Sequence, residues 1–115
     1  IAYTIIDDYT ELVLVYAGLW SDYLKKRRGH EPAFDSKIRF IQTSAMQKKT
    51  LMNKYFSDDL LDNIVVWKNE RNKLLHCMLK QSLTTEYMES VALEGKKLAE
   101  IIRIRGNNLK KIAKK

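Results

Sequence analysis

Three residues close together in the middle of the chain have the clearest capacity for chemistry: Arg71, Asn72 and His76. A histidine imidazole can accept or donate a proton near neutral pH, so His76 is a candidate general acid or base. The planar guanidinium of Arg71 can pair bidentately with a phosphate and stabilise negative charge that grows on it. Asn72 can orient either group. Together these residue types favour chemistry on a phosphate ester.

The element that carries these residues is predicted to be a helix over residues 58–81. Arg71 falls within an apolar stripe, and Lys68 and Asn72 interrupt the neighbouring stripe at the same level. Because an unpaired guanidinium is costly to bury, Arg71 needs either a carboxylate partner or a wet cleft. Such a local failure of the apolar pattern indicates a site. The apolar stripe consists of Leu60, Ile64, Trp67, Leu74 and Met78.

The spacing also limits what one helix can do. Arg71 and His76 are five residues apart, which places them about 140° apart around an ideal helix. A single helix therefore does not aim both at one small ligand, unless the long arginine side chain curls around. A two-fold dimer that pairs this face with itself would bring two Arg71 and two His76 side chains together.

A structural role explains each residue taken alone. A buried arginine on a bundle helix often pairs with a carboxylate of a facing helix, and Asp62 and Glu70 lie nearby in the sequence. A histidine at the border of an apolar stripe is commonly a packing residue. The joint placement of Arg71, Asn72 and His76 at one level favours a site.

The rest of the chain predicts one all-α domain over residues 1–115, an up-and-down bundle of four main helices. Thr4 caps the first, which ends at Gly29; Asp35 or Ser36 caps the second, which runs to about Phe56. Ser57 caps the third, and Thr84 or Thr85 starts the fourth. The sequence Gly106-Asn107-Asn108 ends or kinks the fourth helix before a Lys-rich tail, about 107–115, with a short fifth helix there as an alternative.

The chain of 115 residues carries 21 Lys and Arg against 14 Asp and Glu, a formal charge of +7. Such a surface attracts polyanions, which favours nucleic acid as a partner. Lys68, Lys73 and Lys80 are candidates for holding phosphates, although a solvated charged face explains them equally well.

The cysteine count and the hydropathy indicate which bonds, metal sites and cellular compartment to expect. Cys77 is the only cysteine, which excludes an internal disulfide and a multi-cysteine zinc site and favours a reducing cytoplasm. With two histidines in the chain, we expect no metal site. The longest apolar stretch, residues 12–20, is far shorter than the roughly 20 residues that span a bilayer, and no signal-peptide pattern is present. We expect a cytoplasmic protein without membrane contact.

Residues 67–76 resemble the signature of the HEPN superfamily, in which an Arg, usually followed by a polar residue such as Asn, precedes a His after four to six intervening positions. Here Arg71, Asn72 and His76 carry the match. The family places this motif on a core helix of a four- to five-helix bundle, which agrees with the helices predicted above. Many HEPN toxins that pair with a nucleotidyltransferase antitoxin have a Tyr two positions after the His, where this chain has Met78.

The resemblance implies a metal-independent endoribonuclease of toxin or defence type, with no cofactor and with its site at a dimer interface. His76 would move the proton of a ribose 2′-OH or protonate the leaving 5′-oxygen, and Arg71 would stabilise the phosphorane. Asn72 would orient His76 or the phosphate. The products would be a 2′,3′-cyclic phosphate and a 5′-hydroxyl, and the partners would be RNA, a second copy and an antitoxin protein.

Two other functions are compatible with the sequence. The first is a non-catalytic HEPN-like module that binds a partner protein such as a nucleotidyltransferase antitoxin, a nucleotide or RNA. The second is a plain helical interaction domain in which Arg71 and His76 are structural.

Overall fold

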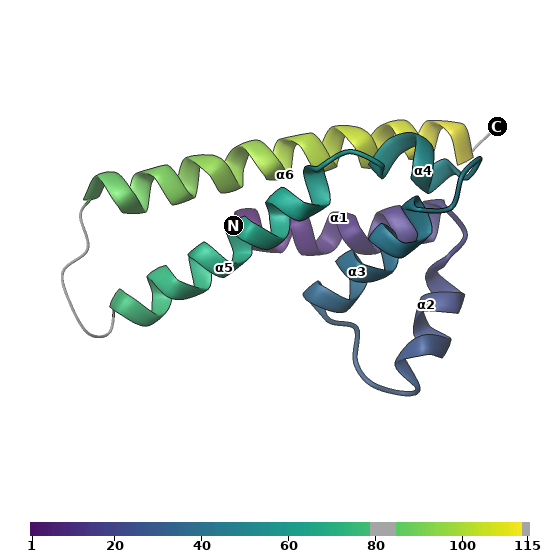
Figure 1. Cartoon of the computed structure of the whole chain (residues 1–115), viewed down its shortest axis with the longest axis horizontal. Helices are drawn as coiled ribbons and strands as arrows, with labels where there is room; N and C mark the ends of the chain where they lie inside the picture. The colour runs from purple at the N-terminus through teal and green to yellow at the C-terminus, as the bar shows by residue number, and fades with distance from the viewer. Residues whose placement is uncertain (79–84, 114–115) are drawn as a thin grey trace.

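The computed structural model describes residues 1–78 and 85–113, which are helical with short connections and contain no strand (Figure 1). The all-α prediction is confirmed. Where the sequence predicts four main helices, these ranges contain six, because the first two predicted helices are each broken once. The helices are α1 (Ala2–Tyr16), α2 (Trp20–Arg27), α3 (Phe34–Ala45), α4 (Leu51–Phe56), α5 (Leu60–Met78) and α6 (Thr85–Ala113).

The prediction of one continuous helix up to Gly29 is wrong, because Gly18 ends α1. Gly18 has a positive φ of 75°, a conformation that glycine adopts without steric cost and that commonly terminates a helix. The amide of Leu19 then donates to the carbonyl of Leu14 at 2.8 Å, which closes the end of α1 before α2 turns away. At its other end α1 already begins at Ala2, so Thr4 lies inside the first turn rather than at the cap.

The second predicted helix is also broken, between Ala45 and Leu51. Thr50 caps α4: its side-chain oxygen accepts a hydrogen bond from the amide of Asn53 at 3.1 Å. The side chain of Asn53 donates back to the carbonyl of Ala45 at 2.8 Å, so α4 folds against the end of α3. In the sequence, Thr50 as an N-cap residue is the local feature that indicates the start of α4.

The predicted end or kink at Gly106 is wrong as well, since α6 continues through it to Ala113. Gly106 is buried and faces Tyr9 of α1, whose Cδ1 would lie 3.0 Å from a Cβ placed there. Gly106 therefore does not form a turn; its missing side chain allows α1 to pack closely against α6. Leu109, within the predicted tail, is fully buried, and no separate fifth helix forms between residues 107 and 113.

Helix α6 runs along both α1 and α5 and joins them into one structure (Figure 1). Trp67 of α5 packs on Gly95 of α6, and its Nε1 donates to the carbonyl of Val91 at 2.9 Å. The buried apolar residues form one cluster that includes Ile6, Val13 and Leu14 of α1, Ile38 and Ile41 of α3, Leu61 and Ile64 of α5, and Leu98 and Ile102 of α6. None of the described helices is both long and apolar enough to cross a membrane.

Two ion pairs fasten the outer helices to this frame. Lys37 of α3 is buried, and its Nζ contacts Asp7 of α1 through the carboxylate at 2.5 Å and the carbonyl at 2.9 Å. Arg105 of α6 holds Asp58, in the connection before α5, through two nitrogens at 2.6 and 2.5 Å. Because Arg105 also donates to the carbonyl of Tyr55, it ties the end of α4 to α6.

We predict that Gly95→Ala lowers the free energy of unfolding by about 1–2 kcal/mol, although alanine favours a helix over glycine by about 1 kcal/mol. A Cβ at this position would lie 2.7 Å from Cε2 of Trp67 and 2.8 Å from its Nε1, so the indole must move. Urea unfolding of Gly95→Ala, Trp67→Phe and the double variant measures the effect. The two costs should be less than additive, because the smaller ring relieves the overlap. A stabilising Gly95→Ala would contradict this packing.

The Asp58 contact predicts a pH dependence of stability. Hydrogen bonding to Arg105 is the main reason that the pKa of Asp58 lies below its usual value. A lowered pKa in the folded state adds stability that is present above the unfolded pKa of about 4 and is lost as the pH falls through the folded pKa. Asp58 is about half exposed, so the gain is expected to stay below about 1 kcal/mol. Thermal unfolding should show Asp58→Asn less stable than wild type at pH 6 but equal to it near pH 2; a constant difference would contradict the assignment.

Candidate functional site

Helix α5 divides into a buried first half and a more exposed second half. Leu60, Ile64 and Trp67 are buried, whereas Leu74 is half-buried and Leu75 is 45% exposed. The polar level that interrupts the apolar pattern lies where α5 changes from one environment to the other. At this position the Asn72 and His76 side chains are exposed, while those of Lys68 and Arg71 are partly buried.

Arg71 is half-buried and lies against α1. Its guanidinium carbon is 4.4 Å from the centre of the Tyr3 ring, in a cation–π contact. The Tyr3 ring in turn stacks on Phe34 of α3, with the ring centres 4.5 Å apart and the planes inclined by 14°. Among the described residues, the only other polar contact of this guanidinium is from Nη1 to Asn72 Oδ1 at 3.5 Å, the limit of a hydrogen bond. The aromatic stack thus fixes the arginine while most of its donors stay available.

No carboxylate among the described residues forms an ion pair with Arg71. The two acids that a structural role would use have other partners. Glu70 accepts a hydrogen bond from the hydroxyl of Tyr87 at 2.6 Å and lies 3.8 Å from Lys73. Asp62 accepts one from the side chain of Gln42 at 2.7 Å. The positive charge of Arg71 is therefore held in place without being neutralised.

Asn72 and His76 are both exposed and lie one turn apart on the same face of α5. No described residue makes a hydrogen bond to the His76 imidazole. Because α5 is regular through this stretch, the angular separation of Arg71 and His76 persists, and Arg71 is turned toward α1. One copy of the chain brings Arg71 and Asn72 together but does not bring His76 and Arg71 onto one point.

The three lysines predicted to hold phosphates have different surroundings. The Nζ of Lys68 lies 2.6 and 2.8 Å from the carboxylate oxygens of Asp35, and its side chain is only 14% exposed. Lys68 therefore joins α5 to α3, and a phosphate would have to displace Asp35 to reach it. Lys73 is exposed beside Glu70. Lys80 lies outside the described residues.

Tyr3 is the residue of this site that sequence reasoning missed. Its contact with Arg71 joins the first turn of α1 to the middle of α5, and no local spacing indicates such a contact. The available signal was indirect: Arg71 stands in an apolar stripe and requires a neighbour that tolerates a cation. An aromatic face meets that requirement as well as a carboxylate does.

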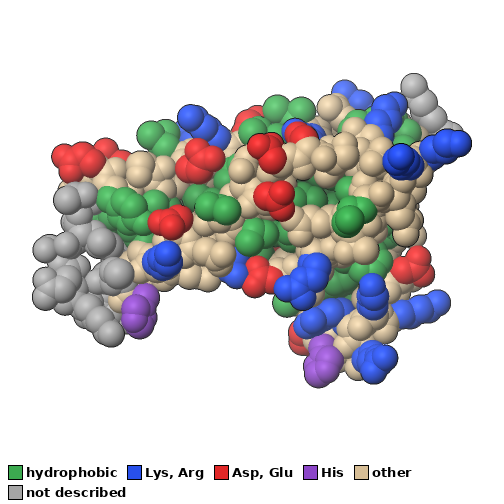
Figure 2. All heavy atoms as spheres, viewed as in Figure 1, with side chains coloured by type: hydrophobic (Ala, Val, Ile, Leu, Met, Phe, Trp, Pro, Cys, Tyr) green, Lys and Arg blue, Asp and Glu red, His purple; other side chains and the backbone are tan. Residues whose placement is uncertain are grey.

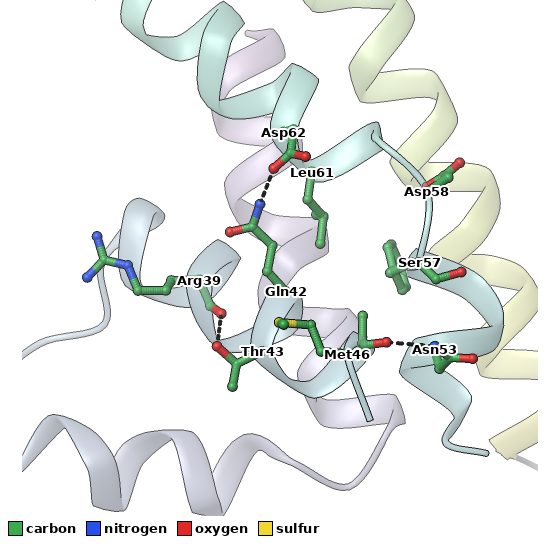
Figure 3. A pocket seen from close by; sticks show the side chains of 11 residues that line it. Arg39, Gln42, Thr43, Met46, Asn53, Ser57, Asp58, Leu61 and Asp62 are labelled. Atoms are coloured by element: carbon green, nitrogen blue, oxygen red, sulfur yellow. Dashed lines mark hydrogen bonds between the residues drawn. The ribbon is translucent and has the colours of Figure 1, made fainter. Parts of the chain in front are cut away.

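A hollow of about 560 Å³ lies elsewhere, between α3, α4 and the start of α5 (Figure 3). None of the predicted site residues lines it. Its acids are already paired, Asp62 with Gln42 and Asp58 with Arg105. Figure 3 shows the Arg39 guanidinium directed away from Asp62, on the outer side of α3. This hollow has space but no free group suited to acid–base chemistry.

Comparisons with known proteins add no family to this description. A scan against protein-family models, a search of curated proteins and a search of solved structures each give no match. Within the described ranges, no three His, Cys, Asp or Glu side chains lie close enough together to hold a metal ion. The geometry around Arg71 is therefore the basis for assigning a function.

We predict that Arg71→Ala lowers the free energy of unfolding by only about 0.5–1 kcal/mol, the value of an accessible cation–π contact. Removing one partner of a buried ion pair would cost about 3–5 kcal/mol instead. Arg105→Ala is the matched control: it removes an arginine from a partly exposed ion pair with Asp58 and from the Tyr55 carbonyl, so it should cost more than Arg71→Ala but less than the loss of a buried pair. Urea unfolding measures both. A loss of 3 kcal/mol or more in Arg71→Ala would assign Arg71 to the structure and remove the basis of a site.

Proposed function

We propose that this chain is a metal-independent endoribonuclease of the HEPN type, with a site that two copies complete. The observation that carries the proposal is the Arg71 guanidinium, fixed on the Tyr3 ring without a carboxylate partner. A rigid, unneutralised guanidinium beside an exposed Asn72 and one turn from an exposed His76 suits a phosphate that gains charge during a reaction. The resemblance of Arg71, Asn72 and His76 to the HEPN signature supports the same function.

The reaction that fits these side chains is cleavage by the neighbouring ribose hydroxyl. One neutral imidazole takes the proton from the 2′-OH, and the 2′-oxygen forms a bond to phosphorus. The bond from phosphorus to the 5′-oxygen breaks, and a protonated imidazole supplies the proton to that oxygen. Arg71 stabilises the charge on the non-bridging oxygens, and Asn72 orients the phosphate. The products are a 2′,3′-cyclic phosphate and a 5′-hydroxyl.

The second copy follows from the placement of the two key side chains. Within one chain Arg71 faces α1 and His76 has no hydrogen-bond partner among the described residues, so His76 lacks an orienting group. A two-fold pairing of the α5 faces would place His76 of one copy near Arg71 of the other and would supply both an acid and a base. Leu75, exposed beside these residues, provides apolar area for such a contact. A reducing cytoplasm and an antitoxin partner complete the proposed setting.

The test is cleavage of a mixed RNA pool by the purified protein in EDTA, with the product ends identified. Wild type should produce cyclic-phosphate ends, and Arg71→Ala and His76→Ala should each reduce the rate by about 100-fold or more. His30→Ala is the matched control, because it removes the other exposed histidine and should leave the rate unchanged. A mixture of Arg71→Ala and His76→Ala should recover part of the activity and exceed either variant alone, since the mixed dimer keeps one Arg71 and one His76 in a shared site but lacks the second imidazole.

Three outcomes would overturn the proposal. Cleavage that survives in both folded variants would point to a contaminating nuclease. If a demonstrated mixed dimer of Arg71→Ala and His76→Ala is no more active than either variant alone, the two copies do not share a site. Absence of cleavage by pure, dimeric wild type would favour the non-catalytic module that binds a partner protein, a nucleotide or RNA, and the unoriented His76 side chain is the observation that supports that second function.

A further inference from the structure

Positive charge gathers in two stretches of the chain. Residues 96–115 contain eight Lys and Arg against one Glu, and two of these cations, Arg103 and Arg105, pair with Glu100 and Asp58. Residues 25–49 contain eight Lys and Arg against two Asp and Glu, a net charge of +6. It comprises the last turn of α2, the connection to α3, α3 itself and the turn that follows. Figure 2 shows Lys and Arg side chains gathered over α2 and the adjoining connection, while Asp and Glu side chains are more frequent over α5 and α6. Most of the excess positive charge therefore lies outside α5.

Within this stretch, α2 and α3 enclose a cleft of about 220 Å³ that has cationic walls and an aromatic floor. Lys26, Arg27 and Arg39 line it, together with Tyr23 and Phe40, and none of its lining residues is acidic. The Lys26 ammonium lies over the Phe40 ring, 5.7 Å from its centre. Phe40 meets the Tyr23 ring edge to face at 5.6 Å, which gives the cleft a rigid apolar base.

The connection between α2 and α3 holds the walls of the cleft in position. The hydroxyl of Tyr23 lies 2.7 Å from Ser36 Oγ and accepts a hydrogen bond from the amide of Ala33 at 3.1 Å. Arg27 donates through Nε and Nη2 to the carbonyl of Glu31, at 3.1 and 2.6 Å, which sets the plane of its guanidinium. The Arg27 guanidinium is thus oriented before any ligand arrives, which lowers the entropic cost of binding there.

Arg39 is unneutralised for a specific reason. Asp35 stands four residues before it on α3, the spacing of a favourable helical ion pair. The Asp35 carboxylate is instead bound by Lys68 of α5 at 2.6 Å, and no described residue forms an ion pair with Arg39. The contact that fastens α5 to α3 therefore removes from the cleft the acid that would compete with an anionic ligand.

We propose that the cleft between α2 and α3 binds a phosphate group of the RNA backbone and so anchors the strand beside the α5 site. The cleft is smaller than the roughly 300 Å³ at which pockets begin to enclose a whole small ligand, which favours one phosphate of a longer chain. The inference rests on the proposed function for RNA as the polyanion. Both sites are built on the first turn of α3, where Phe34 supports Tyr3 beneath Arg71 and Ser36 supports Tyr23. The first turn of α3 therefore links the cleft to the packing beneath Arg71.

Binding of a fluorescent 2′-O-methyl RNA oligonucleotide, measured by anisotropy at several salt concentrations, tests the cleft separately from cleavage. This probe has no free 2′-OH, so it binds without being cut. Lys26→Ala/Arg39→Ala should weaken binding about tenfold or more at low salt and make the salt slope less negative by about 1–2. Lys25→Ala/Lys48→Ala is the matched control, because it removes the same charge from the same stretch but from outside the cleft. The control should change affinity less than about threefold if it removes no phosphate contact.

The outcomes separate the cleft from the nuclease. Equal losses in the two double variants would assign binding to the general field of the surface and overturn the cleft, as would wild type that fails to bind the probe. Wild type that binds but never cleaves RNA leaves the cleft standing and defeats the endoribonuclease. If wild type cleaves RNA and Lys26→Ala/Arg39→Ala binds the probe with unchanged affinity, the endoribonuclease stands and the cleft proposal is overturned. Binding to phosphatidylserine vesicles but not to RNA would assign the cleft to a membrane surface and overturn the proposal.

Discussion

The close approach of α1 and α5 to α6 is the constraint on which the rest of the structure depends. Gly95 and Gly106 are eleven residues apart, which places them only about 20° apart around the helix, on one face of α6. The Trp67 indole fills the space above the first glycine and the Tyr9 ring lies against the second. Because α5 carries Arg71 and α1 carries Tyr3, the cation–π contact of the site exists only while both helices rest on α6. The two glycines of α6 thus allow the helix packing that positions the Arg71 guanidinium of α5.

Three ion pairs of this basic chain join elements that are far apart in the sequence. Asp7 binds Lys37 across α1 and α3, Asp35 binds Lys68 across α3 and α5, and Asp58 binds Arg105 across the connection before α5 and α6. Each pair joins residues far apart in the sequence, so it restrains the fold more than an exposed pair within one helix would. The same pairing determines which cations remain available. Arg71 of α5 and Arg39 of α3 are left without carboxylate partners among the described residues.

How far the sequence predicts this structure depends on the range of each interaction. The apolar period correctly predicts α5 and its buried face, because Leu60, Ile64 and Trp67 follow a local rule. It fails at Gly18 and Gly106, since a glycine that ends a helix and a glycine that admits a neighbouring helix look alike until the neighbour is known. For the site, the broken pattern singles out Arg71 from sequence alone. The Tyr3 partner and the diversion of Asp35 to Lys68 are long-range contacts that no spacing rule contains.

The ion pair between Asp35 and Lys68 links the two parts of the surface that the chain offers to a phosphate. On α5 it neutralises the lysine one turn before Asn72, so Arg71 remains as the cation of that level without a carboxylate. On α3 it withdraws the carboxylate that stands one turn before Arg39. If Asp35 paired with Arg39 instead, the cleft would lose its free guanidinium, and Lys68 would be left largely buried and unpaired, which is costly. Burial of Lys68 therefore favours the arrangement that keeps Arg39 free. The packing of α3 on α5 is thus the physical reason that both surfaces keep a guanidinium available for an anion.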